Sequence, residues 1–182
     1  GDYDGDGLAD PTLYDATAGQ WQARLSGSGY AAAGGMFGGA GYTPASADYD
    51  GDARTDMAVY RATDGEWRVY LIGAGVGVLT GFGGSDYVAV PGDYDGDRKS
   101  DPALYHEASG MWYWLASGSG YALASQWFGA PGYTAVGGDF DGDGKADPAV
   151  YHEATGDWYV WRSSDQTLAT QWLGAPGYAP VE

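Results

Sequence analysis

The chain has 182 residues, with 8 Lys and Arg against 25 Asp and Glu, for a formal net charge of −17. Nucleic acids and anionic membrane surfaces need a basic footprint on the protein, so this balance excludes both as partners. No apolar run approaches the roughly 18 residues of a membrane-spanning helix, which excludes membrane insertion, and with no Cys there is no disulfide framework.

Four copies of one unit make up the chain. An Asp-rich phrase opens at Asp2, Asp48, Asp93 and Asp139, at spacings of 46, 45 and 46 residues. In each copy a Tyr follows the opening Asp after 12 residues and a Trp follows after 19, and Phe-Gly or Leu-Gly stands near the end. A period of this size is typical of propellers and other repeat folds. We therefore expect a single domain, 1–182, of four repeats at approximately 1–47, 48–92, 93–138 and 139–182.

Each repeat predicts four short strands, because apolar runs alternate with turn residues and no helical period is present. In the last repeat the first strand leads into the Asp-rich loop over Thr134–Gly138, and the second covers Pro148–Tyr151. A turn at His152–Gly156 separates it from a third strand that begins at Trp158. The third strand ends in a turn, and the fourth runs to the Phe-Gly or Leu-Gly pair. The turns that end the third strands are predicted at Ser26–Gly29, Ile72–Gly75, Ser117–Gly120 and Ser163–Gln166.

Four strands in about 45 residues is the size of one propeller blade, which predicts an all-β, four-bladed β-propeller with one Asp-rich loop per blade. The ends of the chain extend this prediction. Joined end to end, Tyr178–Glu182 and Gly1–Asp2 read in register with Tyr133–Asp139. We therefore expect the C-terminal segment to pair into the first blade and close the ring. A fragment of a larger propeller, or two chains that form one larger ring, remain as alternatives.

The Asp-rich loops have the composition of a calcium site. Carboxylates stand at loop positions 1, 3, 5 and 9, and the backbone carbonyl of position 7 is a fifth ligand; Ca²⁺ takes six to eight oxygens. The start matches the EF-hand pattern, but the loop closes at nine residues and is flanked by strands. The expected carboxylate ligands are Asp2, Asp4, Asp6, Asp10, Asp48, Asp50, Asp52, Asp56, Asp93, Asp95, Asp97, Asp101, Asp139, Asp141, Asp143 and Asp147, and the carbonyls are those of Leu8, Arg54, Lys99 and Lys145.

The alternative is that Asp-Gly runs form turns and bind nothing. Sixteen carboxylates in four similar clusters argue against it, because unneutralised like charges a few ångströms apart repel one another. We therefore expect about four Ca²⁺ ions, one per repeat. Loops of this kind outside cells bind calcium at about 10⁻⁴–10⁻³ M, which predicts a secreted or cell-surface location.

The four sites are not expected to be equal. Position 6, where a sharp turn favours Gly, is Gly7 and Gly144 in the outer repeats but Ala53 and Arg98 in the middle ones. A residue with a Cβ atom adopts a positive φ at a higher free-energy cost than Gly. The second and third sites are therefore predicted to be weaker.

The loops, with the Phe-Gly and Gly-Ala-Pro turns that precede the next repeat, resemble the FG-GAP (VCBS-like) repeats of bacterial surface proteins and integrin α-subunit propellers. Phe128–Pro131 and Leu173–Pro176 approach the family name literally, whereas Phe37–Ala40 and Phe82–Ser85 do not. Two features depart from the integrin pattern. The Phe-Gly and Gly-Ala-Pro elements, which usually lie further apart in the family, adjoin one another here, and the chain has four repeats instead of seven. The resemblance implies calcium-stabilised blades, an extracellular location, and adhesion or ligand binding.

No enzyme is expected, because the sequence contains no asymmetric set of catalytic residues. The two histidines, His106 and His152, occupy equivalent turn positions and are expected at the surface, as are Glu107 and Glu153 beside them. A polysaccharide-cleaving enzyme stays as a minor alternative, since such enzymes contain related propellers.

Extra aromatic residues in the third and fourth repeats are candidates for ligand binding. They fill the core between blades, or they stack on sugar rings with a neighbouring Gln bonding to hydroxyl groups. The candidates are Trp114, Trp127, Trp161, Trp172, Gln126 and Gln171, with Tyr113 and Tyr159 beside them. We therefore expect a monomeric calcium-binding scaffold for protein interaction or adhesion, with a carbohydrate-binding, lectin-like module as the alternative.

Overall fold

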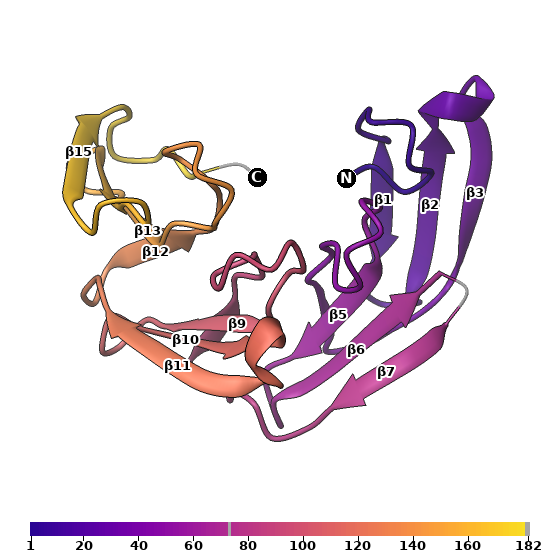
Figure 1. Ribbon diagram of the computed structural model, residues 1–182, viewed down its shortest axis with the longest axis horizontal. Coiled ribbons are helices and arrows are strands. Elements are labelled where there is room, and N and C mark those ends of the chain that lie inside the picture. The colour runs from indigo at the N-terminus through magenta and orange to yellow at the C-terminus, as the bar shows by residue number, and fades with distance from the viewer. Residues whose placement is uncertain (73, 181–182) are drawn as a thin grey trace. The chain divides into compact units, whose positions relative to one another are not determined.

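The computed structural model describes residues 1–72 and 74–180 and contains fifteen strands in four antiparallel sheets, one per repeat (Figure 1). The chain divides into two compact units, Gly1–Ser85 and Asp86–Glu182, each with two sheets. The prediction of an all-β, four-bladed β-propeller is confirmed, because each of the four repeats forms one antiparallel sheet, or blade. Within the described residues, no helix has the length and apolar character needed to cross a membrane.

The first unit holds a three-stranded and a four-stranded sheet, each in chain order. The strands of the first sheet are β1 (Thr12–Asp15), β2 (Gln20–Leu25) and β3 (Ala31–Met36), and a 3-10 turn, η1 (Ser26–Ser28), joins the last two. The strands of the second sheet are β4 (Thr43–Pro44), β5 (Met57–Arg61), β6 (Glu66–Leu71) and β7 (Gly75–Leu79).

The second unit holds two four-stranded sheets. The strands of the third sheet are β8 (Tyr87–Ala89), β9 (Ala103–His106), β10 (Met111–Ala116) and β11 (Ala122–Trp127), with η2 (Ser117–Ser119) between the last two. The strands of the fourth sheet are β12 (Tyr133–Val136), β13 (Ala149–His152), β14 (Asp157–Trp161) and β15 (Leu168–Trp172).

These bounds confirm the predicted order of strands and turns within a repeat. In the second, third and fourth sheets the strand before the Asp-rich loop pairs with the strand after it. The first sheet has no such leading strand among the described residues. Val181 and Glu182, which were predicted to contribute to it, lie outside them, as does Gly73 of the turn predicted at Ile72–Gly75, so ring closure stays a prediction.

The Tyr and Trp that mark each repeat form one cross-strand pair. Tyr105 of β9 lies opposite Trp112 of β10 with ring centroids 5.2 Å apart, and both side chains are fully buried. The Trp112 indole N–H donates to the Phe128 carbonyl at 2.7 Å. The same pair recurs as Tyr14–Trp21, Tyr60–Trp67 and Tyr151–Trp158.

The same packing explains the Gly of the Phe-Gly and Leu-Gly pairs. A Cβ atom added to Gly129 would lie 2.4 Å from the Tyr105 hydroxyl, and Gly129 has a φ of 136°. Gly174 stands in the same relation to Tyr151. A residue with a side chain would clash here, as it would at Gly38 against Tyr14, so the Tyr and the Gly are required together in these three repeats.

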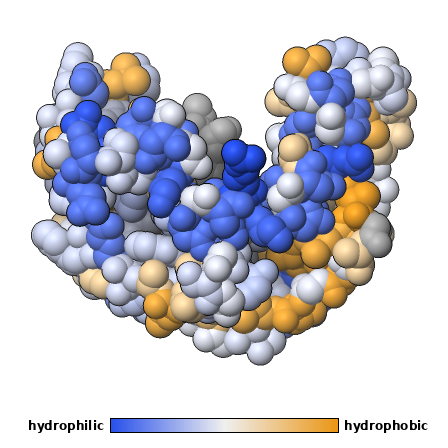
Figure 2. Space-filling model, in the orientation of Figure 1, coloured by the Kyte–Doolittle hydropathy of each residue, from blue (hydrophilic) through white to orange (hydrophobic). Residues whose placement is uncertain are grey.

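The outermost strand of the second sheet presents apolar side chains to solvent. Val76 and Val78 of β7 are 55% and 59% exposed, and Figure 2 shows hydrophobic surface over this strand. Single exposed apolar residues are ordinary on protein surfaces, whereas these two valines lie together on one strand.

Candidate metal centres

Each Asp-rich loop is curled by its own opening carboxylate. Asp48 accepts hydrogen bonds from the backbone N–H of Gly51 (2.7 Å) and of Ala53 (2.9 Å). Asp2, Asp93 and Asp139 make the same two bonds in their loops. These bonds turn the chain back on itself, so that successive carboxylates face the inside of the loop.

Three carboxylates converge in every loop, with one oxygen from each within 4.8 Å of the others. In the first loop they come from positions 1, 3 and 5, and in the other three from positions 1, 3 and 9. The clusters are Asp2, Asp4 and Asp6; Asp48, Asp50 and Asp56; Asp93, Asp95 and Asp101; and Asp139, Asp141 and Asp147. Each cluster has the composition and spacing to hold a metal ion.

The other predicted ligands lie in the same loops but outside these triplets. They are Asp10 in the first loop and the position-5 residues Asp52, Asp97 and Asp143 in the others. The position-7 carbonyls of Leu8, Arg54, Lys99 and Lys145 accept no hydrogen bond from the part of the chain that the structure describes. Those carbonyl oxygens therefore have lone pairs available for a cation.

The closing Asp of each loop is buried, and in the first, third and fourth loops it accepts hydrogen bonds from two segments. Asp101 is fully buried, and its carboxylate accepts from the Tyr94 N–H at 3.0 Å and from the Ser117 N–H at 2.7 Å. Tyr94 belongs to the loop, whereas Ser117 belongs to the turn between β10 and β11. The closing Asp therefore ties the loop to a hairpin of the same blade.

Sequence reasoning missed the serine of that hairpin as part of the site. The Ser117 hydroxyl donates to Asp97 at 2.9 Å, and the Gly118 N–H donates to Asp95 at 2.8 Å. Ser26 and Ser163 make the corresponding hydroxyl bonds, to Asp6 and Asp143. The signal was a Ser 24 residues after the opening Asp in three of the four repeats.

The second loop lacks the hydroxyl bond, because its equivalent residue is Ile72. Within the described residues, Asp56 accepts from the Tyr49 N–H but receives no bond from Ile72. Burial, together with the neighbouring carboxylates, raises the pKa of Asp56 to about 6. In the first loop, by contrast, the backbone hydrogen bond from Ser26 is the largest cause that lowers the pKa of Asp10.

Neighbouring loops within each unit are hydrogen-bonded to one another. The Thr55 N–H donates to the Asp2 carbonyl, and the Ala146 N–H donates to the Asp93 carbonyl, both at 2.6 Å. The Lys145 ammonium also donates to the Asp95 carbonyl at 3.2 Å. Each unit therefore holds its two candidate metal sites as a connected pair.

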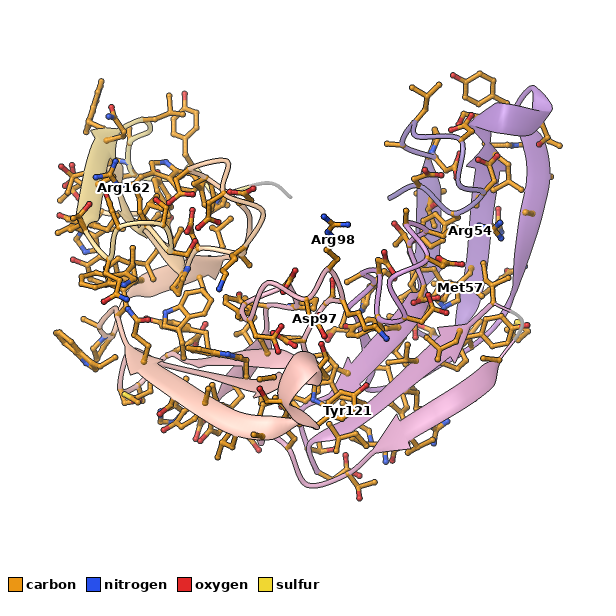
Figure 3. All side chains as sticks on the ribbon, viewed as in Figure 1. Arg54, Met57, Asp97, Arg98, Tyr121 and Arg162 are labelled. Atoms are coloured by element: carbon orange, nitrogen blue, oxygen red, sulfur yellow. The ribbon has the colours of Figure 1, made fainter. Side chains whose placement is uncertain are left out.

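Position 6 has a left-handed backbone in every loop, as the sequence predicted. The φ values are 86° at Gly7, 66° at Ala53, 70° at Arg98 and 92° at Gly144. Figure 3 shows the Arg98 side chain extending away from the ribbon of its loop. The middle two loops therefore contain a backbone conformation that costs a residue with a Cβ about 1–2 kcal/mol.

We expect Arg98→Gly to tighten calcium binding at the third loop about five-fold or more. We expect the metal-free loop to relax this strain and the metal-bound loop to retain it, and about 1 kcal/mol corresponds to a factor of about 5. The substitution also removes a positive charge beside the cation. Calcium titration calorimetry of both proteins measures the change.

Gly144→Ala is the matched reverse substitution. An added Cβ would meet no atom within 4 Å, so only the φ of 92° opposes it. We expect it to weaken the fourth site. Unchanged affinity in both variants would refute the strain argument.

The histidines are packed and do not lie at exposed turn tips. His106 is the last residue of β9, half-buried, with its ring 4.6 Å from the Tyr87 ring and Nδ1 2.6 Å from the Ser109 hydroxyl. His152 repeats this arrangement with Tyr133 and Thr155. In the second blade Arg61 covers the Tyr42 ring in the same way. Glu107 and Glu153 are exposed, as predicted.

The structure separates the aromatic candidates into two places. Trp114, Gln126, Trp127 and Trp161 line one pocket of the second unit. Trp172 lines a different hollow, and Gln171 lies exposed on β15. The tyrosines beside them, Tyr113 and Tyr159, are half-buried and pack on Tyr87 and Tyr133.

Comparisons of the chain with protein-family models, with curated proteins and with solved structures each returned no match.

Proposed function

We propose that this chain is a calcium-binding β-propeller that acts, secreted or at the cell surface, as a scaffold for protein interaction or adhesion. The observation that supports this most directly is the recurrence of one convergent acidic cluster in all four repeats. The clusters consist of carboxylates and offer neither His nor Cys. A hard cation with a high coordination number suits an all-oxygen donor set of this kind, and Ca²⁺ is such a cation.

Calcium in these loops has a structural role under this proposal. The first, third and fourth loops are hydrogen-bonded to the hairpin of their own blade, and within each unit the two loops are hydrogen-bonded to one another. An ion bound by the loop therefore stabilises several segments that are distant in sequence. Because the unfolded chain has no such site, the binding free energy contributes directly to folding.

Three observations support the scaffold role. The histidine rings are engaged in packing, which favours a non-enzymatic protein. The exposed valines of β7 offer a contact surface. The resemblance to FG-GAP repeats implies adhesion or ligand binding outside the cell, where calcium is abundant enough to fill loops that bind at about 10⁻⁴–10⁻³ M.

The test is a calcium titration of the intact chain by isothermal titration calorimetry. We expect about four ions per chain, and a stoichiometry lower by one in the double variant Asp139→Asn with Asp141→Asn. Glu107→Gln, which removes an exposed carboxylate outside the loops, is the control and should leave the stoichiometry unchanged. Mg²⁺ should bind more weakly, because it demands near-ideal octahedral geometry. No saturable calcium binding at millimolar concentration would overturn the proposal.

A further inference from the structure

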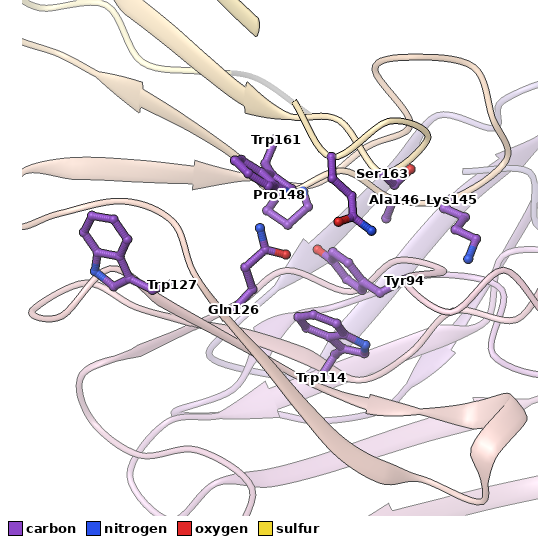
Figure 4. A pocket seen from close by; sticks show the side chains of 10 residues that line it. Tyr94, Trp114, Gln126, Trp127, Lys145, Ala146, Pro148, Trp161 and Ser163 are labelled. Carbon is purple, nitrogen blue, oxygen red and sulfur yellow. The ribbon is translucent and has the colours of Figure 1, made fainter. Parts of the chain in front are cut away.

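A pocket lies in the second unit between the third and fourth sheets (Figure 4). Its volume is about 550 Å³, within the range of about 300–1,000 Å³ that is usual for small-molecule sites. We refer to this pocket, lined by Tyr94, Trp114, Gln126, Trp127, Trp161 and their neighbours, as the aromatic groove. No carboxylate lines it, in a chain with 25 acidic residues.

Aromatic rings form the walls of the aromatic groove. Trp114 stacks on Tyr94, with centroids 5.3 Å apart and an interplanar angle of 27°. Trp161 packs on Phe128 at 6.1 Å. Figure 4 shows Trp161 on one side of the space and Trp114 on the other, with the amide of Gln126 between them. Both tryptophans are half-buried, so part of each ring stays accessible.

The indole groups of these two tryptophans differ from all others in the chain. Six of the eight tryptophans donate their indole N–H to a backbone carbonyl: Trp21, Trp67, Trp112, Trp127, Trp158 and Trp172. Within residues 1–72 and 74–180, the N–H groups of Trp114 and Trp161 have no such acceptor. Two residues that line the aromatic groove therefore have indole donors without a protein acceptor.

The Gln126 amide adds a third polar group without a protein partner. The structure gives its side chain no hydrogen bond to any described residue. A free amide offers two donors and an acceptor, which matches the mixed donor and acceptor character of a hydroxyl group. Ser163 and Lys145 at the edge are engaged, with Asp143 and the Asp95 carbonyl, whereas the side chain of Gln166, which also lines the pocket, has no hydrogen bond to a described residue.

The first unit contains the equivalent pocket and serves as an internal comparison. It is lined by Tyr3, Ala23, Met57 and Ile72, at the repeat positions of Tyr94, Trp114, Pro148 and Ser163. Its volume is about 200 Å³. Gln126 and Trp161 correspond to Gly35 and Tyr70. Tyr70 packs on Phe37 at 6.1 Å, as Trp161 packs on Phe128, but the first unit has Ala23 and Gly35 in place of Trp114 and Gln126. Packing between two blades therefore does not by itself explain Trp114 and Gln126 in the second unit.

We propose that the aromatic groove binds a neutral pyranose ring of a glycan. The C–H face of a sugar stacks on aromatic rings, while its hydroxyl groups pair with amide and indole groups. Acidic sugars fit less well, because the formal net charge of −17 repels anions. The proposal goes beyond the calcium-bound scaffold and does not require calcium to contact the sugar.

The test uses two residues of the aromatic groove and their repeat equivalents as matched controls. Gln126→Ala is compared with Gln171→Ala, and Trp127→Ala with Trp172→Ala. Trp127 and Trp172 are 68% and 71% exposed and each donates to a backbone carbonyl. Within each pair the substitutions therefore remove similar side chains from similar strands, and only one member lies in the aromatic groove.

Binding of neutral methyl pyranosides (glucoside, galactoside, mannoside and N-acetylglucosaminide) to the full chain is followed by calorimetry and tryptophan fluorescence. We expect at least one of them to bind, with an affinity about ten-fold weaker after Gln126→Ala or Trp127→Ala and unchanged after Gln171→Ala or Trp172→Ala. The proposal is overturned if none of these sugars binds, or if the control variants lose binding equally. Calcium stoichiometry measured on the same samples shows separately whether the metal proposal holds.

Discussion

Calcium should raise the melting temperature of this protein by roughly 12–24 °C at a concentration ten-fold above the dissociation constant. One site at that excess contributes about 1.4 kcal/mol, so four contribute roughly 6 kcal/mol. For a chain of this size about 1 kcal/mol shifts the midpoint by 2–4 °C. Thermal unfolding monitored by circular dichroism, with a chelator and then across a calcium titration, measures the shift.

The shift should depend on the loops and on the identity of the ion. Magnesium is expected to produce a smaller rise, and the double variant Asp93→Asn with Asp95→Asn should lose roughly a quarter of the calcium effect. The Asp93 carboxylate also organises its loop through the backbone of Gly96 and Arg98. The variant must therefore be compared with the wild-type protein in chelator as well as in calcium. An unchanged midpoint at millimolar calcium would contradict the metal assignment.

Trp112→Ala should destabilise the protein by about 3–5 kcal/mol. Trp112 is fully buried, its ring packs against Tyr105 and Tyr94, and its N–H donates to the Phe128 carbonyl. Truncation leaves a cavity and an unpaired, partly buried carbonyl, and both cost free energy. Urea denaturation in calcium measures the loss. Trp172→Ala, at an exposed position, should cost about 1 kcal/mol or less.

The equivalent variant in the first unit, Trp67→Ala, tests whether the two units unfold together in one transition. Trp67 is 1% exposed and makes the same bond, to the Phe82 carbonyl. If the chain unfolds as the single domain that the sequence predicts, either variant should lower one common transition. If the two units unfold separately, each variant should shift only the transition of its own unit.

The strands and loops were predictable because the information that specifies them is local and repeated four times. Every repeat has an Asp-rich loop, then a Tyr, a turn and a Trp in the same order. One short apolar run could be a strand or part of a helix, but agreement among four copies identifies it as a strand. The convergence of the carboxylates was predictable for the same reason, since the bonds that curl the loop span only three to five residues.

Contacts between segments distant in sequence were not predictable in this way. Ser117 reaches Asp97 across 20 residues, and the composition of a Gly-Ser turn reveals only that it is a turn. The histidines were expected at the surface in turns; each is instead the last, half-buried residue of its strand, with one ring face on a Tyr of the neighbouring strand.

The sequence by itself determined the repeat, the blade architecture and the four acidic loops, because the repeat period and the spacing of residues can be read directly along the chain. Only the tertiary structure decided which aromatic residues act together. By repeat position, Trp127 and Trp172 are equivalent, yet only Trp127 lies in the aromatic groove. A groove needs the facing surfaces of two adjacent blades, and the second unit contains one such boundary, between its third and fourth sheets. Which side chains line that boundary depends on how the two sheets pack, and residue spacing within a single repeat carries no information about it.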